Sequence, residues 1–425
     1  MVTLLTEKEI SKTVNNKNIT FNRKHYAKAL IFIIFVSFLN ATLRLTEDGL
    51  SLYRLLIPVQ IFLLALINLK QFKAFVICFV SIAILSLLGL LLSTYSLKVI
   101  NIVFFTHYLI IILFFYSVKT IYCVLGSKVV FNFLHFSFYL FVFSGILDLL
   151  GFSFPNIENV PYAVRGVHKI ENDFSLVLSS FVFILFAVES KFLYKILILL
   201  FVSIVAFFND AKIIVLALFM LVMVDFFIFN KNIPKKIKIL TTAISSLAII
   251  FSLYWLADYK IQFPGAEYSL LELILEPIVR IITLDPFGDL YGSISNRTDM
   301  IIFSLQDLIS SYGLGIGFGN TLQMLESAKY GTIGSAQSIH NFPLQFTVEL
   351  GLFVTGFILF RLLRKLNMNI IMFFFVMLFS SLSQSVGLFS NYYFFCCLYF
   401  LILNSKEQFK KINKIDVRYL SNEKN

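Results

Sequence analysis

The feature that most constrains this chain is a succession of long apolar runs separated by short polar breaks. Between Ala29 and Asn404 these runs recur at a length of about 20 residues, which is what an α-helix needs to cross a lipid bilayer. The 425-residue chain is 59% hydrophobic and only 14% charged, whereas soluble domains carry about 25% charged residues. So much apolar surface requires lipid as its solvent, and the sequence therefore predicts an all-α polytopic membrane protein.

The positions of the runs predict about twelve transmembrane helices. Neighbouring runs are almost continuous at Glu47–Gly49, Ser93–Ser96 and Asn209–Lys212, where periodicity alone does not separate a hairpin from one long helix. Residues 29–404 would form a single transmembrane domain. The predicted spans are approximately 29–46, 50–69, 74–94, 97–117, 129–150, 173–189, 192–208, 213–229, 237–256, 343–362, 369–388 and 390–404.

The charges orient these helices. The chain carries 35 Lys and Arg residues against 24 Asp and Glu residues, for a net charge of +11. With the N-terminus inside, the cations concentrate in cytoplasmic segments, as the positive-inside rule requires. We therefore expect cytoplasmic tails at residues 1–28 and 405–425, the first of them disordered. The excess of positive charge therefore indicates topology. Nucleic-acid binding is the rival interpretation of a basic chain, and the concentration of cations in cytoplasmic segments disfavours it.

Cysteine usage bounds the chemistry. Cys78, Cys123, Cys396 and Cys397 all fall in predicted spans or cytoplasmic loops, so we expect no disulfide. The sequence contains no Cys/His ligand spacing and no paired-carboxylate pattern for a metal ion. We expect neither a metal site nor another cofactor.

Two predicted loops on the outer side are longer than a connection needs to be, at about 151–172 and 257–342. Long ordered loops usually carry function. Within the second loop, residues 268–282 and 295–312 predict amphipathic helices. The first of these has Glu276 and Arg280 at i, i+4 spacing on its polar face. Both helices could instead simply lie on the membrane surface.

Four alternating glycines, from Gly313 to Gly319, follow the second amphipathic helix. A nucleotide-binding glycine loop would need a preceding strand and a βαβ unit, which the sequence does not indicate here. We expect a flexible turn that returns the chain to the bilayer.

The sharpest local feature surrounds His340. Pro343 suits a first helical position and Asn341 suits the N-cap before it. His340 would then sit just outside a helix N-terminus, where positive potential favours a neutral imidazole that can act as a general base. Asn341, Gln345 and Glu349 recur every four residues, and a Glu inside a membrane is either partnered or functional. The alternative is that His340 only hydrogen-bonds at the helix start.

Four cations are predicted at the same outer face, namely Arg165, Lys212, Arg280 and Arg297. Each by itself is more often an ion-pair partner than a ligand group. Together they would suit a pyrophosphate, because guanidinium and ammonium groups bind phosphate oxygens through charge-assisted hydrogen bonds.

The run from His340 to Gly356 resembles a signature of the O-antigen ligase and polymerase superfamily, in which a His-Asn pair precedes a helix with a Leu-Gln step and a Glu-Leu-Gly sequence. The segments Asn296–Ile302 and Gly313–Asn320 are similar to that family's arginine-led loop helix and its glycine-rich end. Glu171–Phe174 resembles a further element that opens the sixth span. The chain departs from the family at Lys212, where the family usually has arginine, and lysine holds phosphate as a point charge without a bidentate fork.

The resemblance implies a GT-C-like fold and glycosyl transfer at the periplasmic face of a bacterial inner membrane. The donor would be a glycan on undecaprenyl pyrophosphate, with no cofactor. His340 would position or deprotonate the acceptor hydroxyl. Arg297, together with Lys212, would hold the pyrophosphate and stabilise its charge as it departs. The residues that would bind pyrophosphate or glycan are Lys212, Arg165, Arg280, Asn341 and Glu349.

Three activities remain open from the sequence. We expect a polymerase that joins lipid-linked repeat units. A ligase that transfers glycan to lipid A-core shares the same motifs, and a lipid-linked sugar flippase is the alternative from another class. The expected partners are the lipid-linked glycan, membrane lipid and a chain-length regulator protein, with no nucleic acid.

Overall fold

The described part of the chain is helical apart from one short hairpin and the connecting turns. The computed structural model describes residues 7–40, 42–43, 45, 51–92, 95, 97–155, 157, 163–168, 171–188, 191–209, 211–226, 234, 260–263, 266–286, 293–327, 341–364, 366, 368–382 and 391–404. Within these residues β1 (Lys260–Phe263) pairs antiparallel with β2 (Ala266–Ser269), and the other elements are helices. The predicted helical character is confirmed, with the hairpin as an addition.

Four helices in the described part of the chain are long and apolar enough to cross a membrane. They lie within α3 (Leu69–Leu92), α4 (Val99–Leu125), α5 (Ser127–Leu149) and α6 (Glu171–Val188). A fifth candidate is the bent pair α13 (Phe342–Leu350) and α14 (Leu352–Leu363), if the two form one span. The chain therefore has the character of a membrane protein.

Shorter apolar helices of 10–17 residues also coincide with predicted spans. Each is shorter than the run from which it was predicted or close to the lower limit for a span. The predicted span 237–256 lies outside the described residues. The shorter helices are α2 (Leu52–Ile67), α7 (Phe192–Phe208), α8 (Lys212–Val224), α15 (Met368–Ser380) and a helix at Tyr392–Asn404.

The N-terminal segment differs from the expectation. Residues 1–28 were predicted as a disordered tail, but α1 runs from Glu7 to Phe38. The apolar part of α1 is continuous with the polar part, and once the apolar turns are formed each further residue adds a hydrogen bond at little cost. Helix therefore propagates into a sequence that would not form it alone.

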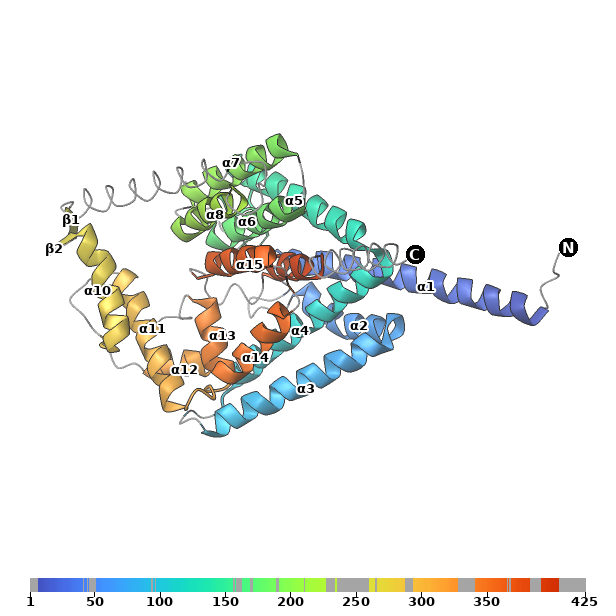
Figure 1. Cartoon of the computed structure of the whole chain (residues 1–425), viewed down its shortest axis with the longest axis horizontal. Helices are drawn as coiled ribbons and strands as arrows, with labels where there is room; N and C mark the ends of the chain where they lie inside the picture. Colours follow the sequence, from blue (N-terminus) through green and yellow to red (C-terminus); the bar gives the residue numbers. More distant parts are fainter. Residues whose placement is uncertain are drawn as a thin grey trace, which may run out of the picture. The chain divides into compact units, whose positions relative to one another are not determined.

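The chain divides into two compact units. Unit 1 comprises Met1–Ser81, Thr106–Val215 and Gly387–Asn425. Its core is α6, which is buried continuously from Asp173 to Phe186 and contacts both α5 and α7 (Figure 1). This continuous burial means that neighbouring helices, and not lipid, surround α6 over most of its length.

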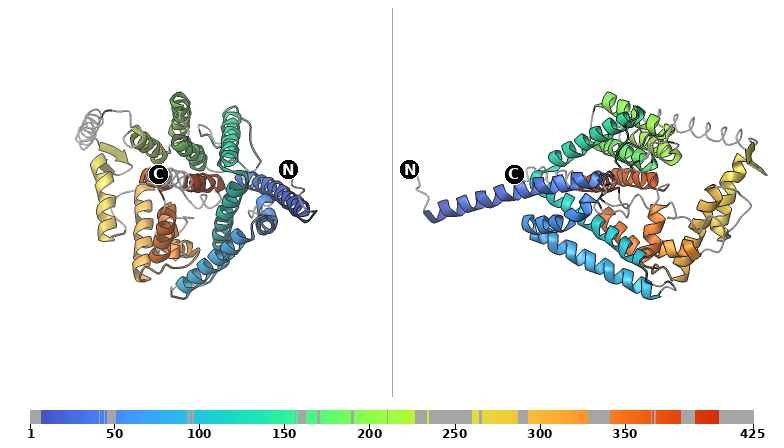
Figure 2. Two further views of the ribbon diagram at one scale, coloured as in Figure 1. Left: turned by 45° about the vertical axis from the view of Figure 1, so that its right-hand side comes forward. Right: turned by 180° about the vertical axis from the view of Figure 1, so that it is seen from behind.

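Unit 2 comprises Ile82–Phe105 and Leu216–Val386. It contains the long predicted loop, which folds into the hairpin, α10 (Leu270–Thr283), α11 (Ser293–Ser310) and α12 (Asn320–Ser327). The first two helices confirm the amphipathic helices predicted at 268–282 and 295–312. They lie side by side in every view (Figure 2).

The tenth predicted span is wrong as a single straight helix. α13 and α14 meet at Gly351 with a bend of 118°. Gly351 adopts a φ of +88°, which is left-handed backbone that favours glycine. The apolar run 343–362 does not indicate this break, because an apolar pattern predicts burial and not the direction of the helix axis.

The bend is held by the glycine-rich segment 313–319, here termed the glycine joint. The peptide N–H of Ile316 donates to the carbonyl of Val348 at 2.9 Å, and that of Gly317 donates to the carbonyl of Glu349 at 3.1 Å. These carbonyls end α13 and have no partner within the helix. The glycine joint therefore satisfies the end of α13.

The same segment also holds the start of α14, because the N–H of Leu352 donates to the carbonyl of Gly313 at 2.8 Å. A Cβ on Gly315 would lie 2.5 Å from the nitrogen of Gly351, so only glycine allows this approach. The sequence predicted a flexible turn here. The glycines instead serve close packing of backbone on backbone.

A substitution at Gly315 tests the joint. Gly315→Ala would place a Cβ against Gly351 at a φ of +84°, and we expect it to lower the free energy of unfolding by about 1–3 kcal/mol or more. The matched control is Gly356→Ala within α14, where an added Cβ meets nothing within 4 Å. The control should be neutral or slightly stabilising. Thermal unfolding of the detergent-purified protein measures both, and equal stabilities would contradict the packed joint.

Candidate functional site

The sequence-predicted site residues divide between the two units. Unit 1 contains Arg165 and Lys212, and unit 2 contains Arg280, Arg297, Asn341 and Glu349. His340 lies outside the described residues, and of Lys212 only its position as the first residue of α8 is described.

Asn341 is the N-cap of α13, as predicted. Its side-chain Oδ1 accepts a hydrogen bond from the N–H of Leu344 at 3.1 Å, and Pro343 occupies the first turn. The cap satisfies one of the N–H groups that a helix start leaves without a partner. His340 directly precedes this cap in the chain.

Glu349, the one acidic residue of the predicted site, is buried, with 1% of its surface exposed. Its Oε1 accepts a hydrogen bond from the hydroxyl of Thr321 at 2.5 Å and one from Nε2 of Gln345 at 3.2 Å. The i, i+4 stripe predicted from Gln345 to Glu349 is thus confirmed as a contact. These bonds offset part of the cost of burying a carboxylate.

Three amide side chains form a second buried cluster that the sequence did not indicate. Asn101, at the start of α4, donates through Nδ2 to Oδ1 of Asn320 at 2.6 Å. Gln323 donates through Nε2 to Oδ1 of Asn320 at 2.8 Å and of Asn101 at 3.1 Å. Thr321 lies between these residues on α12, so one short helix contacts both the start of α4 and the carboxylate on α13. The partners are too distant in the chain for spacing to reveal them.

The two arginines of the long loop have different surroundings. The side chain of Arg280 is 6% exposed and forms ion pairs with Asp299 and, at 3.4 Å, with Glu276. It also donates to Ser295 at 3.3 Å, so it fastens α10 to α11. Arg297 lies on α11 with its side chain exposed. Of the two, Arg297 is therefore the one that presents its charge outward.

A carboxyl group on α11 is held by a phenol. The hydroxyl of Tyr95 donates to Oδ2 of Asp307 at 2.6 Å. Burial raises the pKa of Asp307, and the hydrogen bond from Tyr95 lowers it by a smaller amount. The contact ties the turn between α3 and α4 to α11.

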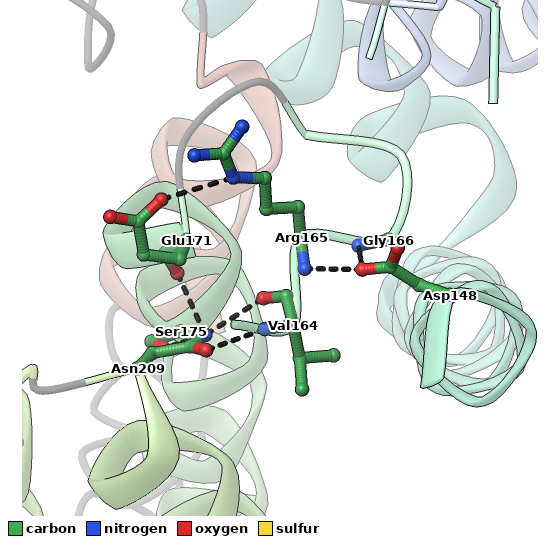
Figure 3. A network of polar contacts seen from close by, with 7 residues as sticks. All are labelled: Asp148, Val164, Arg165, Gly166, Glu171, Ser175 and Asn209. Carbon is green, nitrogen blue, oxygen red and sulfur yellow. Dashed lines mark hydrogen bonds and ion pairs between the residues drawn. The ribbon is translucent and has the colours of Figure 1, made fainter. Parts of the chain in front are cut away.

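In unit 1, Arg165 is held by one carboxylate oxygen from each of two acidic residues (Figure 3). Its backbone N–H and that of Gly166 donate to Oδ2 of Asp148 at 2.6 and 3.0 Å. Its Nε donates to Oε2 of Glu171 at 3.2 Å. Glu171 is the first residue of α6, so the ion pair sits at a helix N-terminus, where an anion is stabilised.

Asn209 fixes the loop that carries Arg165. Its Oδ1 accepts from the N–H of Val164 at 2.8 Å, while Nδ2 donates to the carbonyl of Val164 at 2.8 Å and to Oγ of Ser175 at 2.9 Å (Figure 3). The amide of Asn209 thus pairs with both backbone groups of Val164, as the backbone of a neighbouring β-strand would. Asn209 stands in the turn before Lys212, and the sequence identified that turn without revealing this bracing role.

His168 lies in the same loop. Its ring packs between Phe141 and Phe174, with centroids 5.5 and 5.9 Å away. The ring keeps some exposure, but Nε2 is buried and has no hydrogen-bond partner within the described residues. Burial lowers the pKa of His168 to about 4, because the protonated ring cannot be solvated there.

Comparison with protein-family descriptions, curated proteins and solved structures finds no match for this chain. The resemblance to the O-antigen ligase and polymerase superfamily therefore rests on the motif residues alone. Within the described residues, no group of three or more His, Cys, Asp or Glu side chains is arranged to hold a metal ion. The function has to be inferred from the geometry of these side chains.

The buried ion pair of Arg280 can be tested by stability. Arg280→Met leaves Asp299 buried without its cation, and we expect a loss of about 3–5 kcal/mol in the free energy of unfolding. The double variant Arg280→Met/Asp299→Leu should recover part of that loss. Arg297→Met is the matched control on an exposed position and should leave thermal unfolding unchanged. A small effect of Arg280→Met would rule out the bracing role.

Acid stability tests the environment of His168. The unfolded chain binds a proton near pH 6.5 and the folded chain only near pH 4. Between these values the unfolded state takes up the proton first, so the free energy of unfolding falls as the pH falls, by up to about 3 kcal/mol. Above about pH 6.5 this dependence vanishes. His168→Phe keeps the ring packing and should flatten the profile; an unchanged profile would contradict the assignment.

Proposed function

We propose that the protein is a membrane glycosyltransferase that polymerises undecaprenyl-pyrophosphate-linked oligosaccharide repeat units into O-antigen or a related surface polysaccharide. In this proposal about twelve helices span the inner membrane in a GT-C-like arrangement, with both termini cytoplasmic. The single observation that supports it best is the sequence of elements from α11 to α13. An exposed Arg297, the glycine joint, the capped start of α13 after His340 and the buried Glu349 follow in the order of the family motifs.

The chemistry proposed for these residues is the transfer of a glycosyl group from a pyrophosphate to a hydroxyl group. The acceptor hydroxyl attacks the anomeric carbon of the donor glycan, and the bond from that carbon to the pyrophosphate oxygen breaks. His340 accepts the hydroxyl proton, and Arg297 stabilises the negative charge on the departing pyrophosphate. The exposure of Arg297 supports this role, because its charge is directed away from the scaffold.

The remaining cations receive separate roles. Arg165 and Lys212 are proposed to bind pyrophosphate or glycan, since Arg165 is held in place by Asp148 and Glu171. Arg280 is assigned to the scaffold, because its guanidinium is buried against carboxylates. Glu349 and Asn341 are proposed to hold the start of α13, the helix that follows His340 in the sequence.

A transporter of lipid-linked sugar is the second candidate, because the 118° break between α13 and α14 is also what substrate-binding helices of transporters show. A ligase would use the same donor and the same residues. A deletion strain separates the three activities: single repeat units on the core indicate a lost polymerase, long chains left on the carrier lipid indicate a lost ligase, and units held at the cytoplasmic face indicate a lost flippase.

Variants of the proposed centre test the enzyme. His340→Ala and Arg297→Met should abolish chain growth while the amount of membrane-inserted protein stays unchanged. Arg297→Lys should retain part of the activity, because it keeps the charge and loses the planar fork. Electrophoretic ladders of glycan length measure the outcome. A normal distribution of glycan lengths in the His340→Ala variant would contradict the proposal.

A further inference from the structure

A cavity of about 260 Å³ lies beside the glycine joint in unit 2. Its walls come from the end of α3, the start of α4 and the joint itself. The apolar side chains that line it include Ala83, Leu87, Leu90, Ile102, Phe105 and Phe318.

The polar groups in the wall are engaged by the protein. Ser86 accepts a hydrogen bond through Oγ from the N–H of Phe318 at 3.0 Å, and Asn101 donates through Nδ2 to the carbonyl of Phe318. These bonds fix the backbone of Phe318 and turn its ring toward Phe105, with centroids 5.5 Å apart. A cavity whose polar atoms are satisfied in this way is apolar, and it favours a hydrocarbon over water.

The mouth of the cavity lies on the exposed surface of α3 and α4. Leu87, Leu97 and Ile102 are 55, 67 and 58% exposed, whereas Ser86 and Phe318 at the floor are 4 and 6% exposed. Only 17% of the spanning window of α3 is buried. Exposed apolar residues of a membrane span contact lipid, so the cavity opens toward lipid chains.

We propose that this cavity is the subsite for the isoprenoid chain of the polyprenyl pyrophosphate carrier. The hydrocarbon enters between α3 and α4 and ends against Phe318. The choice of a polyprenyl lipid over a phospholipid rests on the proposed function, whereas the preference for a hydrocarbon rests on the cavity alone.

The position of Phe318 gives this subsite a link to α13. Phe318 directly follows Gly317, whose N–H donates to the carbonyl of Glu349. On its other side the glycine joint packs against Gly89 of α3, because a Cβ on Gly89 would lie 3.1 Å from the carbonyl oxygen of Gly315. One packed backbone segment therefore forms the floor of the cavity and supports the helix that His340 precedes.

Photolabelling of the full-length protein in lipid nanodiscs tests the subsite. The probe is undecaprenyl phosphate with a diazirine on its chain, and the labelled residues are mapped by peptide mass spectrometry. We expect attachment at the cavity residues of α3 and α4 and at Phe318. Unlabelled undecaprenyl phosphate should compete, and phosphatidylethanolamine should not. Attachment spread over exposed apolar residues, or equal competition by phosphatidylethanolamine, would overturn the proposal.

Two variants sharpen the test. Ala83→Phe fills the cavity and should lower labelling roughly tenfold, while Leu88→Phe introduces the same aromatic side chain at an exposed position of the same helix and should leave labelling unchanged. If Ala83→Phe does not fold, the milder Ala83→Leu replaces it. Labelling is scored independently of glycan ladders. If Ala83→Phe lowers the labelling but leaves the glycan ladders normal, the subsite is retained and the glycosyltransferase is rejected. If Ala83→Phe changes neither the labelling nor the ladders, the subsite alone is rejected.

Discussion

The hydrogen bonds between the glycine joint and the break at Gly351 are the constraint on which unit 2 depends. A broken helix exposes the carbonyls that end its first half and the N–H groups that begin its second half. In an apolar medium each such group costs several kcal/mol if it stays unpaired. Ile316 and Gly317 supply the donors, and Gly313 supplies an acceptor. The bend exists because another piece of backbone completes it.

Several side-chain contacts follow from this backbone contact. The joint ends at α12, whose Thr321 reaches Glu349 on α13. Its Phe318 is anchored by Ser86 and Asn101, which belong to α3 and α4. A buried carboxylate, an amide cluster and an apolar cavity thus share one support. Such preorganisation suits a site that must hold groups in register while lipid surrounds it.

Polar residues in both units follow the rule that buried hydrogen-bonding groups must find partners. Asn209 meets it by bonding both the N–H and the carbonyl of Val164. Arg280 meets it by pairing with Asp299 and Glu276. Position in the sequence could suggest that such residues matter. Whether an arginine braces the scaffold or presents its charge outward depends on neighbours that only folding brings together, as the contrast between Arg280 and Arg297 shows.

The sequence by itself determined the helical, membrane-type character, the amphipathic helices of the long loop and the cap at Asn341, because composition, periodicity and capping act over a few neighbouring residues. Only the tertiary structure decided the break at Gly351, the packed state of the glycine joint and the partners of Asn101 and Glu349. Glycine permits both a flexible turn and close backbone contact, and which one occurs depends on what lies opposite. That information belongs to contacts between distant segments, which no local pattern contains.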